Sequence, residues 1–289
     1  MKLAKQARHC LKGQWKGAVL AQWSLMTAGL LLLLLEVLIL RITGIGIEEV
    51  LHFDELMGDS RLLLHALIIV GIVLLDVFLT SPLRLGQAAY YYQLAGRGGE
   101  KKISSKILRS FYTAKRYGRS LRWRLSIWWR RAAWSLVCYT PAALILGYGQ
   151  LLVDRGETGI LAEINLLFAG FFGLFALLAG FVSVQMIMLR YMPVQYLLYE
   201  EKSVHQAFRR SRKLMRGRTG EVAWVYAGFS GWLITCVLFL PYFYVSPLFL
   251  TSRALWVKRA EMQQKREEEL EWAQTRPIED LGTAVAHGI

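Results

Sequence analysis

The sequence has few charged residues and lacks the side-chain arrangements that are typical of soluble enzymes. Only 19% of its 289 residues are charged, whereas 55% are hydrophobic. A soluble protein of this composition would struggle to cover its apolar surface. We find no phosphate-binding glycine loop, nucleophile elbow or His-Glu-x-x-His motif, and no Ser/His/Asp set at an interpretable spacing. We therefore expect a protein that is not an enzyme and that has no cofactor.

Cysteine is also scarce. Cys10, Cys138 and Cys236 lie far apart and form no Cys-x-x-Cys pair. This spacing argues against both a disulfide framework and a zinc site. Cys138 and Cys236 sit in apolar stretches, where we expect them to be small buried side chains.

The most prominent feature of the sequence is a set of long hydrophobic runs. A bilayer core about 30 Å thick is crossed by about 20 apolar residues in a helix. The runs cover residues 18–40, 62–80, 132–153, 159–189, 222–240 and 242–257. We therefore predict an all-α fold, a polytopic transmembrane helix bundle of about six spans. Ser81-Pro82 is expected to stop the second span, and the short sixth run could instead be re-entrant.

Lysine and arginine alternate between the segments outside these runs. The first five such segments contain 5, 2, 13, 1 and 8 basic residues, counted from the N-terminus. Because cytoplasmic segments are enriched in Lys and Arg, this order predicts a cytoplasmic N-terminus. A sixth crossing would also place the charged tail, 258–289, in the cytoplasm. We therefore predict a multi-pass protein of the cell membrane, with cytoplasmic basic segments at 81–131 and 190–221.

The second of these segments contains the string AFRRSRKLMRGRTG (207–220). Ser203 and Gln206 fit a capping box, and apolar residues recur at helical spacing from Val204 to Met215. We predict a basic amphipathic helix whose apolar face lies in the headgroup layer and whose cations meet anionic lipid. The candidate contact residues, for lipid or for an acidic partner, are Arg209, Arg210, Arg212, Lys213 and Arg216. Alternatively, these charges only fix the topology.

The larger basic segment repeats this theme. Between 101 and 114, apolar residues recur at helical spacing among lysines and arginines, which predicts a second interfacial helix. The tryptophans that follow are expected to form an aromatic belt at the membrane surface: Trp123, Trp128, Trp129 and Trp134. Binding of nucleic acid is not expected, because no recognisable nucleic-acid module surrounds either basic segment.

Two carboxylates, Glu36 and Asp76, lie within the predicted spans. Their depths differ by about 20 Å at 1.5 Å per helical residue, so a shared ion site is not expected. We expect Glu36 to reach the outer headgroups or Arg41, and Asp76 to reach the inner basic loop at Arg84. An ion-coupling role is the alternative, because charges within a membrane are by default functional candidates.

Small residues line one face of the fourth predicted span. Ala169, Gly173, Ala176 and Gly180 follow one another at intervals of four, three and four. Such a stripe lets helix backbones approach closely. We expect it to pack within the chain, and a dimer seam is the alternative.

Three strings carry a resemblance to a known family: SPLRLGQAAYYYQLAGRG (81–98), HQAFRRSRKLMRGRTGEVAWVYAGFSGW (205–232) and LPYFYVSPLF (240–249). The chain resembles bacterial multi-pass membrane proteins catalogued as domain of unknown function 975. It departs from their pattern in the fourth span, where LLAGFVSVQMIML (177–189) lacks a Pro-Gly break. The resemblance implies a six-helix membrane protein and supplies no activity and no catalytic residues.

These features favour a non-enzymatic structural or regulatory membrane component. Its expected partners are anionic lipid headgroups, other membrane proteins or a second copy of itself. A small-solute transporter or permease subunit is the alternative. That alternative predicts a water-accessible cavity near the midplane of the membrane, lined by polar groups such as Gln185 or Asp76.

Overall fold

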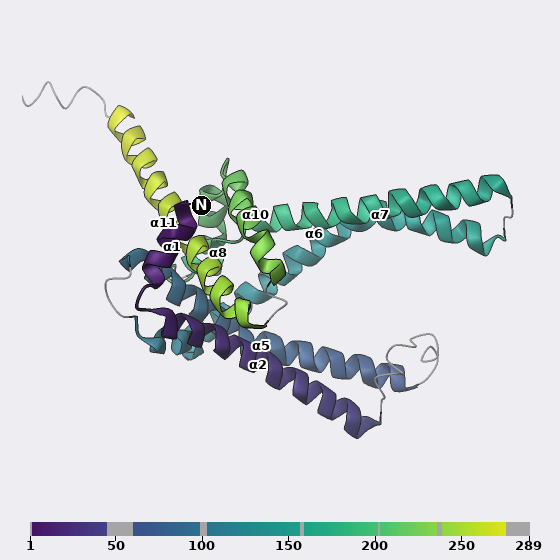
Figure 1. Cartoon of the computed structure of the whole chain (residues 1–289), viewed down its shortest axis with the longest axis horizontal. Coiled ribbons are helices and arrows are strands. Elements are labelled where there is room, and N and C mark those ends of the chain that lie inside the picture. The colour runs from purple at the N-terminus through teal and green to yellow at the C-terminus, as the bar shows by residue number, and fades with distance from the viewer. Residues whose placement is uncertain are drawn as a thin grey trace, which may run out of the picture.

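The computed structural model describes residues 2–44, 60–98, 103–156, 159–201, 203–235 and 239–275. Within these ranges the regular elements are all helices, so the predicted all-α class is confirmed for this part of the chain. The helices form two long hairpins that project in the same direction from a shared base (Figure 1).

Each hairpin pairs two long helices that lie side by side. The first consists of α2 (Trp15–Thr43) and α5 (Ser60–Arg97). The second consists of α6 (Ala114–Asp154) and α7 (Ile160–Leu189). At the end of α2, Gly44 adopts a φ of 71°, and its N–H bonds to the carbonyls of Leu40 and Arg41. A left-handed residue of this kind is tolerated best by glycine, which is why the helix ends there.

The base, which we call the head, contains the shorter elements and the ends of the hairpin helices that adjoin them. It contains α1 (Lys2–Leu11), the 3₁₀ helix η1 (Ser105–Tyr112), α8 (Val194–Leu197), α9 (Val204–Leu214), α10 (Thr219–Thr235) and α11 (Phe239–Thr275). Helix α11 packs on α1, α5 and α10, and its far end extends away from the hairpins (Figure 1). The first part of the charged tail, up to Thr275, is thus the end of α11.

Four helical segments of the described chain are long and apolar enough to cross a membrane: Trp15–Thr43, Leu63–Arg97, Ala114–Asp154 and Ile160–Leu197. They contain the predicted spans 18–40 and 132–153 and all but the first residue of 62–80 and 159–189. The runs at 222–240 and 242–257 correspond to α10 and α11, which do not meet this criterion within the described residues. Six spans are thus not confirmed. Helix α11 instead contributes Val245, Ala254 and Val257 to the head core.

The hairpins present apolar side chains outward along their length. Leu136 on α6 is 75% exposed and Leu161 on α7 is 78% exposed. Each such side chain would gain roughly 1.5–3 kcal/mol on full transfer from water to an apolar medium. The hairpin surfaces are therefore suited to hydrocarbon rather than to water.

Helix α5 does not stop at Ser81-Pro82, so that predicted boundary was wrong. Pro82 lies inside the helix and has no N–H to bond the carbonyl of Phe78. Instead, the Tyr117 hydroxyl of α6 donates to this carbonyl at 3.1 Å. The Tyr112 hydroxyl of η1 donates to the carbonyl of Leu79 at 2.8 Å. The bond from Tyr117 satisfies the carbonyl that proline frees, and the bond from Tyr112 satisfies the next one. The helix therefore continues to Arg97.

Three consecutive tyrosines of α5 form the centre of the head core. Tyr90, Tyr91 and Tyr92 are all buried, which successive residues of a helix achieve only when protein surrounds it. The Tyr91 hydroxyl donates to the carbonyl of Ala18 at 3.1 Å. The Tyr92 hydroxyl donates to Glu261 at 2.7 Å. The polar ends of these rings thus connect α5 to α2 and α11.

The small-residue stripe of α7 faces α6 within the same chain. Ala169, Gly173 and Gly180 are buried and Ala176 is partly buried. A Cβ added to Gly173 would collide with the side chain of Leu146, and one added to Gly180 would lie 2.8 Å from the carbonyl oxygen of Cys138. The stripe therefore sets how closely the two helices approach.

Gly180→Ala is expected to destabilise the second hairpin by about 1–3 kcal/mol, because the new methyl group would meet the backbone of α6. Gly170→Ala, in the same helix, is the matched control because its Cβ would have no atom within 4 Å. The control should be neutral or stabilising by up to about 1 kcal/mol, because alanine favours the helix. Unfolding of both variants in mild detergent measures this difference, and equal effects would argue against close packing at Gly180.

Candidate functional site

A cavity of about 830 Å³ lies between the two hairpins and the head. Its walls come from α2, α5, α6, α7, α10 and α11, together with residues 191–196. A volume of this size is in the range of small-molecule sites in proteins. The lining residues include Asp76 and Gln185, the two polar groups that the transporter alternative named.

Three arginines and one aspartate give the cavity wall an excess of positive charge: Arg84, Arg124, Arg253 and Asp76. A guanidinium nitrogen of Arg124 lies 3.6 Å from a carboxylate oxygen of Asp76. We predicted Arg84 of the basic loop as the partner of Asp76, but the ion pair is with Arg124 of α6. Arg84 lines the same cavity without an ion pair in the described chain.

Amide side chains connect the helices on one side of the cavity. Gln87 of α5 donates to the carbonyl oxygen of Gln22 at 2.7 Å, and Gln22 donates to the Tyr242 hydroxyl of α11. Both glutamines are buried. Buried amides stabilise a fold only when they are hydrogen-bonded, so this chain of bonds fixes the relative positions of α2, α5 and α11.

Arg253 of α11 is held by aromatic rings rather than by a carboxylate. Its guanidinium carbon lies 5.4 Å from the ring centres of Tyr226 and Phe249, and 5.9 Å from that of Tyr196. Its Nε is buried and has no hydrogen-bond partner among the described residues. A cation in this setting has been partly desolvated without neutralisation, which is costly unless something else compensates.

Trp123 was expected in an aromatic belt at the membrane surface, and the structure corrects this. Its side chain is buried, lines the cavity and belongs to a core cluster with Phe208 and Val194. Trp128, Trp129 and Trp134 are exposed. The buried indole Nε1 of Trp123, like Nε of Arg253, has no acceptor within the described part of the chain.

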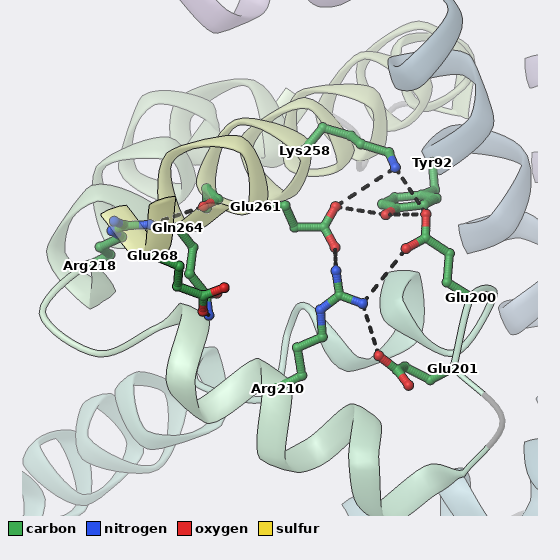
Figure 2. Close-up of polar contacts among 10 residues, drawn as sticks. Tyr92, Glu200, Glu201, Arg210, Arg218, Lys258, Glu261, Gln264 and Glu268 are labelled. Carbon is green, nitrogen blue, oxygen red and sulfur yellow. Dashed lines mark hydrogen bonds and ion pairs between the residues drawn. The ribbon is translucent and has the colours of Figure 1, made fainter. Parts of the chain in front are cut away.

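A second polar feature is an ion-pair network centred on Arg210 of α9 (Figure 2). One guanidinium nitrogen of Arg210 lies 2.9 Å from Glu201, and another lies 2.8 Å from Glu261 of α11. Lys258 lies 3.2 Å from Glu200. Glu261 is only 8% exposed and also accepts from Tyr92, so the network reaches into the head core.

The pKa of Glu200 is set by this network. Burial alone would raise it, but a hydrogen bond from Tyr92 and the positive charge of Lys258 and Arg210 together lower it below the ordinary glutamate value. A lowered folded-state pKa stabilises the protein above the unfolded-state pKa, and this stabilisation is lost as the pH falls through the folded value.

The thermal stability of the protein should therefore fall as the pH drops from 7 to below 4, with a measurable share due to Glu200. Glu200→Gln is expected to have lower stability than the unaltered protein at pH 7 and a smaller further loss on acidification. Melting temperatures in detergent at both pH values measure this, with the exposed Glu269→Gln as control. An unchanged pH dependence in Glu200→Gln would show that Glu200 does not contribute.

Helix α9 is the basic amphipathic helix predicted near 203–217, but its apolar face packs in the protein. Ala207, Phe208 and Leu214 are buried in the head, and Arg130 lies 4.0 Å from the ring centre of Phe208. The predicted capping box is absent, since Ser203 makes no side-chain cap bond. The apolar face is therefore already covered by other helices and is not left for the headgroup layer.

The candidate contact residues of α9 and the turn after it divide into two groups. Arg210 binds carboxylates of the head, and Lys213 lies 2.7 Å from Glu268 of α11. Arg209, Arg212 and Arg216 are exposed and have no ion pair within the described residues. Of the five candidates, only these three are exposed without an ion pair in the described part of the chain.

The two intramembrane carboxylates are not brought together. Asp76 lines the cavity, whereas Glu36 is partly exposed on α2. Gly29 is the last α2 residue on the cavity wall, and Glu36 lies seven residues, or about two turns, further along the helix. Within the described chain no group of three His, Cys, Asp or Glu side chains could hold a metal ion.

Sequence reasoning missed Arg253 and the three tyrosines. Arg253 was not singled out, although it interrupts the apolar string PLFLTSRALWV (247–257). That interruption was the available signal, because an arginine inside an apolar run needs a compensating environment. The string YYY (90–92) offered no comparable signal, since its three rings point in different directions on a helix.

A family model described as "Protein of unknown function (DUF975)" matches residues 1–263, which is most of the chain. No curated protein and no solved structure matches the chain. The three strings on which the resemblance was recognised all lie within the matched residues. Because the match covers far more than half of its length, this chain belongs to the DUF975 family.

Proposed function

We propose that this protein is a non-enzymatic membrane component that holds an amphiphilic ligand between its hairpins. The observation that carries the proposal is the cavity of about 830 Å³ where the hairpins meet the head. Leu25, Met26 and Gly29 of α2 form an apolar part of its wall, whereas arginines and amides line other parts. A ligand with an apolar portion and a polar portion would match both.

The proposed orientation has the hairpins in the bilayer and the head on the cytoplasmic side. The exposed apolar side chains of both hairpins support the first part. The concentration of Lys and Arg in the head segments 81–131 and 190–221 supports the second. In this orientation the exposed Arg209, Arg212 and Arg216 can contact anionic headgroups or an acidic partner protein.

Filling the cavity tests the proposed function. Gly29→Phe is expected to reduce the amount of lipid or other amphiphile that the protein retains through purification in mild detergent, because Gly29 lines the cavity and its Cβ would point into open space. Gly71→Phe is the matched control, since Gly71 also has open space but lies outside the cavity. Mass spectrometry of the retained molecules measures the difference, and equal retention by the two variants would contradict the proposal.

A small-solute permease is the second candidate, and Asp76 and Gln185 on the cavity wall favour it. A permease must open its site to both sides of the membrane, whereas a ligand-holding protein need not. Gln185→Cys in a background without the native cysteines distinguishes them. Labelling by impermeant reagents from both sides favours transport, and labelling from one side favours a ligand-holding role.

A further inference from the structure

The cavity wall has more hydrogen-bond donors than acceptors. Nε of Arg253 and Nε1 of Trp123 are both buried without an acceptor in the described part of the chain, and both residues line the cavity. Arginine and tryptophan side chains can only donate. Native proteins leave few buried polar groups unpaired, so this part of the wall is poor in acceptors and suits a ligand that supplies acceptor oxygens.

The charges on the wall select the same kind of ligand. Among the described residues that line the cavity, Asp76 is the only carboxylate, and Arg124 already pairs with it at 3.6 Å. Arg84 and Arg253 therefore remain without a carboxylate partner on the wall. A metal cation would be repelled here, whereas a carboxylate or phosphate would accept from the guanidinium groups with charge-assisted bonds.

The aromatic rings around Arg253 position it without neutralising it. Tyr196 and Tyr226 lie on one side of the head core, and both rings are within 6 Å of the guanidinium carbon. Rings hold a cation in place and exclude water, but they leave its N–H groups free for an anion. Arg253 is thus positioned to bind an anionic group of a ligand and does not serve in a structural ion pair within the described residues.

The remaining wall and the position of the cavity indicate that this anion carries an apolar chain. Leu25, Met26 and Ile127 line the side toward the hairpins, which are the segments with apolar outer surfaces. Asp76 and Arg84 lie at the end of the predicted span 62–80 that meets the head. A lipid of the same leaflet could therefore place its headgroup at Arg253 and its chain between the hairpins.

We infer that the cavity binds the anionic headgroup of a membrane lipid, with Arg253 as the main ligand of its phosphate or carboxylate. This inference rests on the proposed function and adds to it the charge of the ligand and the residue that recognises it.

Titration with brominated lipids tests it, because bromine quenches tryptophan fluorescence on contact and Trp123 is on the cavity wall. The purified full-length protein is titrated in detergent with brominated phosphatidylglycerol or brominated phosphatidylcholine. Subtracting the signal of Trp123→Phe isolates the quenching at the cavity. We expect saturable quenching with the anionic lipid, at least about tenfold tighter than with the zwitterionic one.

Arg253→Gln should remove this preference, and Arg253→Lys should restore part of it, since lysine keeps the charge. Arg259→Gln is the control on α11, because Arg259 contacts Gln6 and does not line the cavity. Arg84→Gln provides a second cavity variant if Arg253→Gln does not fold. Both cavity variants are accepted only if they elute as single species with unchanged helical content.

Two results would overturn the inference, and only the first of them leaves the proposed function standing. The first is equal affinity for the two lipids, with Gly29→Phe still lowering retention. The second is complete displacement of the anionic lipid by millimolar inorganic phosphate, which would identify a soluble anion as the ligand. If Gly29→Phe has no effect either, the cavity does not hold an amphiphile and the proposed function fails as well.

Discussion

Replacing Arg210 by methionine is expected to lower the free energy of unfolding by about 2–3 kcal/mol. Arg210 bonds to Glu201 at 2.9 Å and to Glu261 at 2.8 Å. Without it, the nearly buried Glu261 keeps only Tyr92 and a more distant Lys258. Removing one partner of a buried ion pair typically costs about 3–5 kcal/mol, and the partial exposure of Arg210 reduces this figure.

Lys213→Met is the matched control, because Lys213 pairs with Glu268 on the same two helices but both side chains are at least half exposed. It should cost at most about 1 kcal/mol. Adding Glu261→Gln to Arg210→Met should recover part of the loss, since it removes the uncompensated charge. Unfolding in mild detergent measures all variants, and equal effects at Arg210 and Lys213 would mean that the network does not stabilise the head.

Gly86→Val is expected to prevent stable folding of the head. Helix α5 passes so close to η1 that a Cβ at Gly86 would collide with the carbonyl oxygen of Leu108 and lie 2.8 Å from its carbonyl carbon. These are backbone atoms, so no rotamer change can relieve the contact. Gly86→Ala should already destabilise the head, because overpacking of about 1–3 kcal/mol outweighs the roughly 1 kcal/mol that alanine contributes to a helix.

Gly96→Ala is the control in the same helix and the same region. Its Cβ would meet only the end of the Lys258 side chain, at 3.5 Å. It should be neutral or stabilising by up to about 1 kcal/mol. Size-exclusion profiles and melting temperatures compare the variants. If Gly86→Val eluted and melted like Gly96→Ala, the close contact between α5 and η1 would be wrong.

Hydropathy predicted the hairpin helices because their environment is uniform. The runs 18–40 and 159–189 lie within α2 and α7, whose residues need only be apolar and free of helix breakers. The same reasoning failed at Pro82, where a local rule predicted a stop. The hydrogen bond that satisfies the freed carbonyl of Phe78 comes from Tyr117, and nothing in the local sequence specifies that contact.

The head was less predictable because the apolar faces of its helices pack against protein rather than against lipid. The spacing of apolar residues in α9 correctly indicated a helix with one apolar face. It could not say whether Phe208 meets lipid or Arg130, since both surroundings favour the same pattern. Similarly, the charge of Arg210 was read as available for lipid, although Glu200, Glu201 and Glu261 lie close enough to neutralise it.

The candidate site was predictable only in part. Asp76 was identified from its place within an apolar run, and Gln185 was named as a cavity-lining group for the transporter alternative. The cavity itself arises from helices that are far apart in sequence, including α2, α7 and α11. Its cationic character depends on Arg253, whose role becomes visible only once Tyr196 and Tyr226 are seen around it.

The central claim is that the two hairpins cross the bilayer and separate their tips from the head. Labelling of single cysteines with an impermeant maleimide, in a background without the native cysteines, tests it directly. Arg41→Cys and Arg155→Cys lie at exposed hairpin tips, and Arg212→Cys lies on the exposed surface of the head. The account predicts that the two tip positions react in intact cells and that Arg212→Cys reacts only after permeabilisation. Equal reaction of all three positions in intact cells would contradict it.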